Sequence, residues 1–351
     1  MTDRHPVPVG RLAPSPTGLL HLGHARTFLL AWWHIRSRGG RVVLRLEDLD
    51  APRAGPLYHE RVLQDLEWLG LDWSEKPMVQ SQEAERFAAA IQRVLRDGLA
   101  YACVCTRGDL RTVQSAPQQG VTELRYPGTC RGRFASVPEA LRVSGRAPGV
   151  RFLTSPGSCR IIDGFAGPLD CDVAAEIGDF LIARRDGAPA YQLAVVVDDA
   201  RQGVTEVLRG DDLLPSAARQ WHLQRALGLP HPVWIHVPLV VDGCGRRLAK
   251  RSDSMSLAAL RNQGVDPRAI VAWAARSAGH IVPNRVTAQE MVAEFRLGQV
   301  PHAAVVVGPA EISALQAERV QRPRRAPSTE QDESRVNGTT PSINRPHGPD
   351  G

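Results

Sequence analysis

The spacing of apolar positions changes in a regular order along the first 46 residues of the chain. Residues 7–13 form a short extended run, and the apolar residues from position 21 onward then recur at helical spacing. These helical positions are Leu22, Ala25, Phe28, Leu29, Trp32 and Trp33. We expect the helix to end at Gly39-Gly40 and residues 42–46 to form a buried strand, with Glu47 and Asp48 at its carboxyl end. Strand, helix and strand in this order predict a βαβ unit, hence a parallel sheet with binding groups at the strand ends.

Further apolar patterns predict elements over much of the remaining chain. Helical spacing predicts four more helices, at residues 60–70, 84–97, 266–278 and 287–296. Residues 190–208 return to strand patterning, in which the apolar run 194–197 ends at Asp198-Asp199. Residues 101–180 differ, because turn residues are frequent there, the cysteines gather, and residues 150–153 and 160–163 indicate short strands. We interpret residues 101–180 as an insertion between two halves of a nucleotide-binding fold.

The predicted fold is therefore α/β and Rossmann-type, in four segments. Residues 1–100 would form the first half, 101–180 the insertion, and 181–300 the second half with a helical stem. We expect residues 301–351 to be largely disordered, because from about residue 318 Pro, Arg, Ser, Thr, Asn and Gly replace almost all apolar residues.

Composition limits the possible functions only loosely. The net charge of +6 permits a polyanionic partner such as RNA, but a bias towards arginine explains it equally well. No apolar stretch follows the N-terminus and the longest apolar runs are strand-sized, so we expect a cytoplasmic protein without a membrane partner. Six cysteines in 351 residues are not a disulfide scaffold, and clustered cysteines in a reducing compartment more often bind metal.

The loop between the first strand and the first helix carries two histidines. Two prolines in residues 14–18 exclude helix and central strand there. His21 and His24 lie three apart, so they share one face of the first helical turn, where free backbone N–H groups attract anions. Gly18 and Gly23 allow a ligand to approach the backbone closely. Two interpretations stay open, a phosphate-binding site and a turn with two surface histidines.

Three cysteines and a tyrosine form a second candidate site. Cys103 and Cys105 are followed by Tyr126 and Cys130, and three thiolates with one phenolic oxygen can hold a tetrahedral zinc ion. The alternative is that these cysteines are small core residues. The other cysteines have no such partners, and we interpret them as packing residues: Cys159, Cys171 and Cys244.

Two further groups of residues suit anionic ligands. Tyr191 and Arg209 lie on segments predicted as neighbouring strands and can hold a carboxylate, although a structural ion pair between Arg209 and the adjacent acids is the simpler interpretation. Residues 246–251 are a dense cationic stretch with Lys250, and Lys76 is the only other lysine in the chain. A compact ammonium can follow a moving phosphate, whereas a solvated basic turn would need no lysine in particular.

Taken jointly, these segments resemble the catalytic core of class I aminoacyl-tRNA synthetases of the glutamate type. Residues 11–18 with His21-Leu22-Gly23-His24 resemble the family's first signature, the HIGH motif, and residues 247–251 resemble its second, the KMSKS motif. Three more segments match in order: residues 45–50, 191–194 and 207–211. The resemblance covers about residues 9–300. It implies a class I synthetase Rossmann-type fold with a zinc-containing insertion and a short helical C-terminal part.

The number of residues that follow the second signature is typical of one branch of this family. A full glutamyl-tRNA synthetase carries a helical anticodon-binding region there, whereas only about fifty residues of folded composition follow here. In this the chain is similar to the glutamyl-queuosine tRNA(Asp) synthetases, which activate L-glutamate with ATP without tRNA and attach it to the queuosine base in the anticodon of tRNA(Asp). Two alternatives are a glutamyl-tRNA synthetase that charges the 3′ end of tRNA(Glu), and a non-catalytic RNA-binding relative.

The resemblance also implies a role for each matching residue. Arg209 would clamp the side-chain carboxylate of glutamate, Glu47 its α-amino group, and Lys250 would bind ATP and stabilise the leaving pyrophosphate. His21 and His24 would contact the ATP phosphates. Glutamate would be surrounded by Arg11, Leu12, Ala13, Pro14, Ser15, Glu47, Tyr191 and Arg209. One structural zinc ion would be held by Cys103, Cys105, Tyr126 and Cys130.

Some positions depart from the family's pattern. Arg247 and Ala249 replace the lysine and serine of the common second signature, and Ser252-Asp253 stands where the glutamate group often has Asp-Gly. The spacer between Cys105 and Tyr126 is long. Magnesium would accompany ATP rather than have a protein cage of its own. We expect the chain to act as a monomer.

Overall fold

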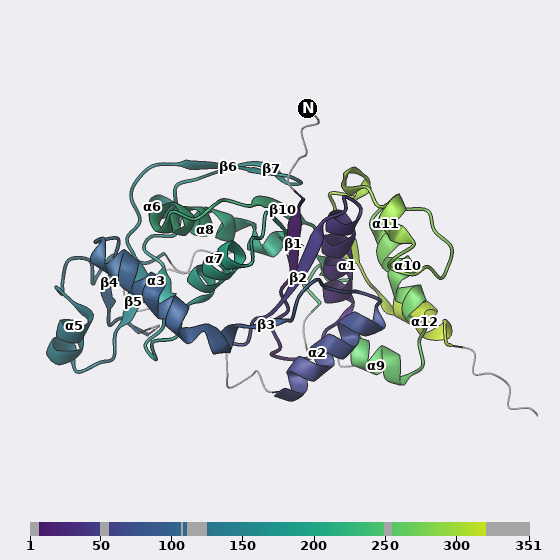
Figure 1. Cartoon of the computed structure of the whole chain (residues 1–351), viewed down its shortest axis with the longest axis horizontal. Coiled ribbons are helices and arrows are strands. Elements are labelled where there is room, and N and C mark those ends of the chain that lie inside the picture. Colours follow the sequence, from purple (N-terminus) through teal and green to yellow (C-terminus); the bar gives the residue numbers. More distant parts are fainter. Residues whose placement is uncertain (1–6, 50–55, 107, 111–124, 249–254, 321–351) are drawn as a thin grey trace, which may run out of the picture. The chain divides into compact units, whose positions relative to one another are not determined.

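The computed structural model describes residues 7–49, 56–106, 108–110, 125–248 and 255–320 (Figure 1). The described residues up to Arg319 form one compact unit. Lys250 and the stretch from 321 onward lie outside the described residues, so the predictions made for them are not tested by the structure.

The N-terminal βαβ unit is present as predicted. Strand β1 (Val9–Leu12) leads through helix α1 (Leu22–Arg36) to β2 (Arg41–Leu46), and β1 pairs with β2 in parallel. Strand β3 (Met78–Val79) extends the sheet in parallel on the other side of β2. Ten residues of α1 are buried, so its tryptophans Trp32 and Trp33 anchor the core on this side of the sheet.

A second parallel pair continues the sheet beyond β1. Strand β9 (Glu206–Gly210) is followed by the short 3-10 turn η3 (Asp211–Leu213), helix α8 (Leu214–Leu227) and β10 (Val233–Val237), and β9 pairs with β10 in parallel. The backbone N–H of Thr205 donates to the carbonyl of Val9 at 2.9 Å, which places β9 beside β1. Chain order therefore reverses between β1 and β9, the position at which open α/β sheets bind ligands beyond their carboxyl ends.

The insertion folds around small antiparallel sheets. Strand β5 pairs with β4 on one side and with β8 on the other, and β6 forms a hairpin with β7. Their bounds are β4 (Ala100–Cys103), β5 (Gly149–Phe152), β6 (Cys159–Asp163), β7 (Gly167–Cys171) and β8 (Leu181–Ala183). The helices before and within it are α2 (Pro56–Trp68), η2 (Gln80–Glu83), α3 (Ala84–Arg96), α5 (Val137–Ser144) and α6 (Val173–Glu176). The predicted helices at 60–70 and 84–97 and the two predicted short strands are confirmed.

The strand predicted at the start of residues 190–208 is wrong. Residues Tyr191–Arg201 form helix α7, and only Glu206–Gly210 is a strand. The residues Leu193 to Val196 are all at most 1% exposed, because α7 packs between α3, α8 and β8. Four consecutive buried residues leave no polar position inside the apolar run, so the run cannot be distinguished from a buried strand by spacing.

The C-terminal part is mostly helical, as predicted, but differs in detail. Helix α10 (Pro267–Ser277) is confirmed, whereas the helix predicted at 287–296 is only the short α11 (Met291–Glu294). Folded structure also continues past residue 301, where the disordered segment was predicted to begin: Leu315 is buried, and β12 pairs with β11. The remaining elements here are β11 (Val240–Val241), α9 (Leu257–Asn262), η5 (Leu297–Gln299), β12 (Val305–Val306) and α12 (Pro309–Ala317).

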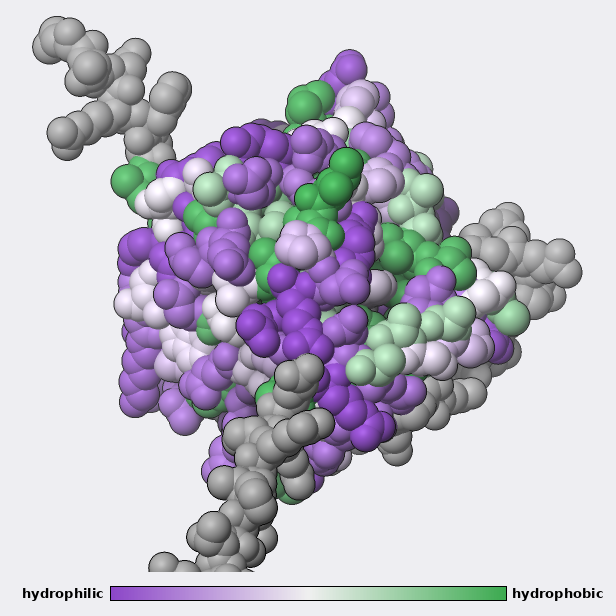
Figure 2. Space-filling view, turned by 90° about the vertical axis from the view of Figure 1, so that its right-hand side faces the viewer, coloured by the Kyte–Doolittle hydropathy of each residue, from purple (hydrophilic) through white to green (hydrophobic). Residues whose placement is uncertain are grey.

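The surface on the side of the C-terminal helices mixes apolar and hydrophilic residues. In Figure 2 green apolar residues are dispersed among purple hydrophilic ones. No helix in the described part of the chain is both long and apolar enough to cross a membrane.

Candidate active site

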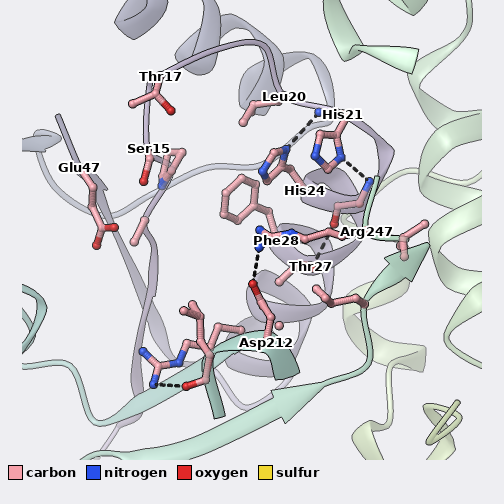
Figure 3. A pocket seen from close by; sticks show the side chains of 18 of the residues that line it. Ser15, Thr17, Leu20, His21, His24, Thr27, Phe28, Glu47, Asp212 and Arg247 are labelled. Atoms are coloured by element: carbon pink, nitrogen blue, oxygen red, sulfur yellow. Dashed lines mark hydrogen bonds and ion pairs between the residues drawn. The ribbon is translucent and has the colours of Figure 1, made fainter. Parts of the chain in front are cut away.

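A cleft of about 430 Å³ opens at the carboxyl ends of β1, β2 and β9. Nine of the predicted site residues line it: Arg11, Ala13, Pro14, Ser15, His21, His24, Glu47, Tyr191 and Arg209. Leu12 does not line it, because alternate residues of a strand face opposite sides and the Leu12 side chain is fully buried in the core. In Figure 3 the histidine pair lies on one side of the cleft and Glu47 on the other.

Helix α1 begins with two histidines that cap it reciprocally (Figure 3). Nδ1 of His21 accepts a hydrogen bond from the backbone N–H of Gly23, and Nδ1 of His24 accepts one from the backbone N–H of His21, both at 3.2 Å. Because each Nδ1 is an acceptor, the proton of each neutral ring lies on Nε2. The ring centroids are 3.8 Å apart. Two Nε2–H donors beside a helix N-terminus form a site suited to phosphate oxygens.

Arg209 is a buried cation at the floor of the cleft. Its side chain donates to Nε2 of His236 at 2.9 Å, to Oε1 of Gln220 at 3.0 Å and to the carbonyl of Leu213 at 3.4 Å. Its Nη1 lies 3.5 Å from Oη of Tyr191. The residue is 4% exposed, yet no carboxylate in the described part of the chain forms an ion pair with it. The alternative of a structural ion pair with the adjacent acids is therefore excluded for the described residues.

Charges of both signs are buried together beside the cleft. Arg45 is fully buried and donates to Asp199 at 2.7 Å and to Glu47 at 3.2 Å, while Arg11 lies 3.7 Å from the same Asp199 carboxylate. Burial lowers the pKa of Arg45, but the carboxylates of Asp199 and Glu47 outweigh it and the pKa is raised. Burial also raises the pKa of Glu47, against the opposing effect of Arg45 and Arg11. This network holds Glu47 at the edge of the cleft.

The described residues on both sides of the segment 249–254, which contains Lys250, lie near the cleft. Arg247 lines the cleft and forms an ion pair with Asp212. Beyond residues 249–254, Ser256 forms an isolated β-bridge with His21. The described residues on both sides of Lys250 thus lie at the cleft or contact His21, while the position of Lys250 stays a prediction.

The four predicted zinc ligands lie together away from the cleft. The sulfur atoms of Cys103, Cys105 and Cys130 all lie within 4.8 Å of one another, with 3.5 Å between Cys105 and Cys130. Oη of Tyr126 lies 3.4 Å from the sulfur of Cys103 and 3.6 Å from that of Cys105. A tetrahedral zinc ion with Zn–S bonds of about 2.3 Å separates its sulfur ligands by about 3.8 Å, so the cluster fits zinc in composition and size.

The charges around the cysteine cluster also suit a metal. Burial raises the pKa of the Cys105 thiol to about 11, so thiolates here need nearby positive charge. Arg151 supplies part of it, because its Nε donates to the sulfur of Cys103 at 3.3 Å and its guanidinium lies 3.7 Å from the centre of the Tyr126 ring. Three thiolates on a divalent cation carry net negative charge, which this guanidinium would offset.

The other cysteines behave in two ways. Cys159 and Cys171 are paired across β6 and β7 and are buried, so their interpretation as packing residues is confirmed. Cys244 is exposed, and its interpretation as a packing residue is wrong, because it lies in the turn after β11 rather than on an element.

Several residues at the site were not predicted from the sequence. His236 and Gln220 accept from Arg209, Asp163 is hydrogen-bonded to His236, and Arg45 holds Glu47. One signal was available for His236, which is the single polar residue of the otherwise apolar strand 233–237. Asp163 is distant from Arg209 in the sequence, and Gln220 lies on a different element, helix α8. No local sequence pattern indicates that either residue belongs to the site.

Known proteins resemble this chain over most of its length. A family model described as "tRNA synthetases class I (E and Q), catalytic domain" matches residues 8–307. The glutamyl-Q tRNA(Asp) synthetase of Symbiobacterium thermophilum is 43% identical over 316 residues, which are 87% of this chain and 98% of that protein. The one of Nitratidesulfovibrio vulgaris is 45% identical over 280 residues, 78% of this chain and 86% of that protein. Glutamate–tRNA ligase 2 of Halorhodospira halophila is 37% identical over 314 residues, 89% of this chain and 66% of that protein.

Two solved structures share the architecture. The glutamate-tRNA synthetase of Elizabethkingia anophelis aligns with a TM-score of 0.74 at 26% identity, over 88% of this chain and 69% of that chain. A glutamate tRNA ligase from Elizabethkingia meningosepticum, solved in complex with its amino acid, aligns with the same TM-score and identity over 88% and 68%. Both therefore share the overall fold of this chain over most of its length.

Proposed function

The chain belongs to the class I tRNA synthetases of the glutamate and glutamine group, and within them to the glutamyl-Q tRNA(Asp) synthetases, and from that membership we propose its reaction. It activates L-glutamate with ATP, without needing tRNA, and transfers the glutamate to the queuosine base in the anticodon of tRNA(Asp). The relatives named for that activity reach 43% and 45% identity, against 37% for a glutamate–tRNA ligase.

The observation that carries the amino-acid part of this proposal is the state of Arg209. A buried cation without a carboxylate partner is costly unless an anionic ligand completes its surroundings. Arg209 lines the cleft beside Tyr191, so the side-chain carboxylate of glutamate would accept from both. Burial alone does not identify a ligand site, because Arg26 is also buried and donates to uncharged acceptors, the carbonyl of Pro238 and Ser277, outside the cleft lining. What distinguishes Arg209 is its place in the lining of the cleft.

The α-amino group of glutamate would lie against Glu47. Burial raises the pKa of this carboxyl, so an ammonium beside it would favour its ionised form and gain a strong interaction in return. Arg11, Ala13, Pro14 and Ser15 also line the cleft. Bound in this way, the substrate would present its α-carboxylate towards the start of α1.

The proposed chemistry needs no covalent nucleophile. An α-carboxylate oxygen of glutamate attacks the α-phosphorus of ATP, the bond from that phosphorus to the bridging oxygen of the β-phosphate breaks, and pyrophosphate leaves with its charge. Catalysis is then positioning and charge stabilisation. The Nε2–H groups of His21 and His24 and the ammonium of Lys250 would donate to the phosphates, and magnesium would enter with ATP.

One zinc ion would stabilise the insertion and would take no part in the chemistry. Cys103, Cys105, Tyr126 and Cys130 would close its coordination, which leaves no open position for substrate. When bound, the ion would supply folding energy to the segment between β4 and β5. We further propose that the protein is cytoplasmic and acts as a monomer on its tRNA.

One experiment separates this proposal from its alternatives. Purified protein is first tested for pyrophosphate exchange with glutamate and ATP in the absence of RNA. Labelled glutamate and ATP are then added to tRNA(Asp) with queuosine, to tRNA(Asp) with guanine at that position, and to tRNA(Glu). We expect exchange without RNA and label on the first tRNA alone.

Controls identify where the label is attached. Periodate blocks the 3′ end of a tRNA but also attacks the queuosine diol, so untreated samples accompany each oxidised one. Label on tRNA(Glu) alone that disappears after periodate would establish the ordinary ligase instead. Absence of any exchange would favour a non-catalytic relative. Arg209→Ala should abolish exchange, whereas Arg93→Ala, which removes a donor to Leu227 far from the cleft lining, should not.

A further inference from the structure

Arg209 is connected through one buried histidine to a carboxylate from the insertion. We propose that Asp163 and His236 are positioning residues that orient Arg209 and so make the cleft select a side-chain carboxylate over an amide. This inference rests on the proposed function, because it gives Arg209 the side chain of glutamate as its ligand. Neither Asp163 nor His236 lines the cleft, and they act only through Arg209.

Strand register brings the first two residues together. His236 on β10 is the direct partner of Arg209 on the parallel strand β9, so their side chains lie next to each other on one face of the sheet. Nε of Arg209 donates to Nε2 of His236 at 2.9 Å, and Nδ1 of His236 lies 2.6 Å from Oδ2 of Asp163. All three residues are at most 4% exposed, so water does not compete for these contacts.

The geometry fixes the protonation of the histidine. Nε of arginine carries a hydrogen and cannot accept, so Nε2 of His236 must be the acceptor and its Nδ1–H must donate to Asp163. Burial lowers the pKa of His236, which keeps the ring neutral in this form. The arrangement is Asp163 to His236 to Arg209, with one hydrogen bond in each step.

Asp163 is itself held in one orientation by the backbone. Its Oδ1 accepts from the N–H groups of Phe165 at 2.9 Å, Ala166 at 2.8 Å and His236 at 3.1 Å. These three donors assign Oδ1 to the backbone and Oδ2 to the histidine ring. The hairpin of β6 and β7, which belongs to the insertion, therefore determines the tautomer of a residue in the Rossmann-type fold.

The remaining hydrogen bonds of Arg209 fix the orientation of its guanidinium group. Oε1 of Gln220 accepts from Nη2 at 3.0 Å, and Gln220 in turn donates to Gln192 at 3.0 Å. With Nε and Nη2 held by neutral acceptors, the side of the guanidinium at Nη1 is directed to Tyr191 and the cleft. The Tyr191 hydroxyl accepts from Nη1, so its own hydrogen is directed elsewhere. Nη1 and this hydroxyl together present donors only, so they suit the two oxygens of a carboxylate and oppose the N–H₂ of a glutamine amide.

Asp163→Asn tests the relay with almost no change of shape. The three backbone donors would keep the amide oxygen at Oδ1, so the amide N–H₂ would face Nδ1 of His236. The ring would then carry its proton on Nε2, which opposes Nε–H of Arg209 and turns the guanidinium. We expect the KM for glutamate in pyrophosphate exchange to rise about 10- to 100-fold with a smaller change in kcat, and the preference for glutamate over glutamine to fall.

Two further variants separate the relay from general stability. His236→Gln places an amide oxygen near the Nε2 position, so it should keep a KM near that of the wild type, whereas His236→Phe should raise it. Asp163→Asn should have almost no further effect on KM in the His236→Gln background, because no tautomer remains to be set. Glu206→Gln is the matched control: it breaks a partly buried histidine–carboxylate pair on the same strand β9, outside the cleft lining, and should leave KM unchanged.

A spectroscopic readout tests the relay without glutamate. The imidazole ¹⁵N shifts of His236, assigned by their loss in His236→Gln, should show Nδ1–H in the wild type and Nε2–H in Asp163→Asn. Nε2–H in the wild type, or equal effects of Asp163→Asn in both backgrounds, would overturn the inference. A wild type without glutamate-dependent exchange would defeat the proposed function and the selective role with it, while the shifts would still report whether Asp163 sets the histidine.

Discussion

His21 and His24 hold the N-terminus of α1 in a reciprocal cap, in which the backbone N–H of His21 donates to the side chain of His24 and the side chain of His21 accepts from the first turn. Each ring therefore has two tasks. Nδ1 stabilises the helix end, and the proposed task of Nε2 is to donate to ATP. The two tasks can be separated by substitution, because they use different nitrogen atoms.

His21→Asn should preserve the cap and remove the donor. The amide oxygen of asparagine can occupy the place of Nδ1, and asparagine is among the best N-cap residues, so the free energy of unfolding should change by less than about 0.5 kcal/mol. His21→Ala should cost about 1 kcal/mol. Both should lower kcat for pyrophosphate exchange by about 100-fold. Denaturant unfolding and exchange assays measure the two effects, and a normal rate in His21→Asn would remove the phosphate role of His21.

Lys250→Ala should lower the rate of glutamate activation more than it weakens glutamate binding. The reason is the place of the described residues that flank it: Arg247 lines the cleft, and Ser256 forms a β-bridge with His21. We expect kcat to fall about 100-fold and the KM for glutamate to change less than about threefold, the pattern of an interaction made in the transition state. Pyrophosphate exchange at varied glutamate and ATP concentrations measures both constants.

The only other lysine supplies the control for this experiment. Lys76 is exposed, and Lys76→Ala should change neither constant. Lys250→Arg asks whether the compact ammonium itself matters, since a guanidinium keeps the charge but not the shape. Near-normal activation by Lys250→Arg would show that the lysine is not required, and equal losses in kcat and glutamate affinity for Lys250→Ala would contradict the transition-state role.

Zinc removal should destabilise the insertion. Protein purified without chelators should hold about one zinc ion per chain, and Cys105→Ser should lose it, with a Tm lower by about 5 °C. Metal analysis and thermal unfolding measure this. Cys244→Ser is the matched control, because Cys244 is exposed and lies outside the cluster. Carefully prepared wild-type protein without zinc, or Cys105→Ser with undiminished zinc, would exclude the proposed metal site.

The sequence predicted the parts of the structure that depend on local pattern. The βαβ unit, the two helices after it and the short strands at Gly149–Phe152 and Cys159–Asp163 each follow from spacing and turn residues close in the chain. The helix at Tyr191–Arg201 was misassigned, because four consecutive buried apolar residues within it show no helical spacing. Leu12 was assigned to the ligand as part of a motif, but strand alternation turns its side chain into the core.

The residues that orient Arg209 could not be predicted from the sequence, for a different reason. Asp163, His236 and Arg209 lie on three segments, separated by 73 and 27 residues along the chain. Their contacts depend on the register of β9 with β10 and on where the hairpin of β6 and β7 is placed. A resemblance to a family identifies the residues of a motif, but it does not show which distant side chain holds each of them.

Stability below pH 5 should depend on Glu206. Burial opposes ionisation of this carboxyl, but hydrogen bonds from His34 and Arg38 outweigh it and lower its pKa to about 2 from a usual 4.5. A carboxyl with a lowered native pKa contributes stability that is fully present above its unfolded pKa and is lost as the pH falls through the native value. The wild type should therefore exceed Glu206→Gln by about 2 kcal/mol above pH 5, and the difference should shrink between about pH 4.5 and 2.

The pKa of Asp198 is shifted in the opposite direction to that of Glu206, so its contribution to stability should change with pH in the opposite sense. Burial raises its pKa to about 6 from a usual 3.8, with Arg45 opposing, so the native state holds a proton that the unfolded chain has already released. Its contribution to stability should then decline as the pH rises from about 4 to 6, and Asp198→Asn should remove that decline. Denaturant unfolding of the three proteins at each pH gives both differences. Because all other titrating groups are shared, parallel curves for the wild type and Glu206→Gln between pH 5 and 3 would contradict the assignment of the low pKa to Glu206.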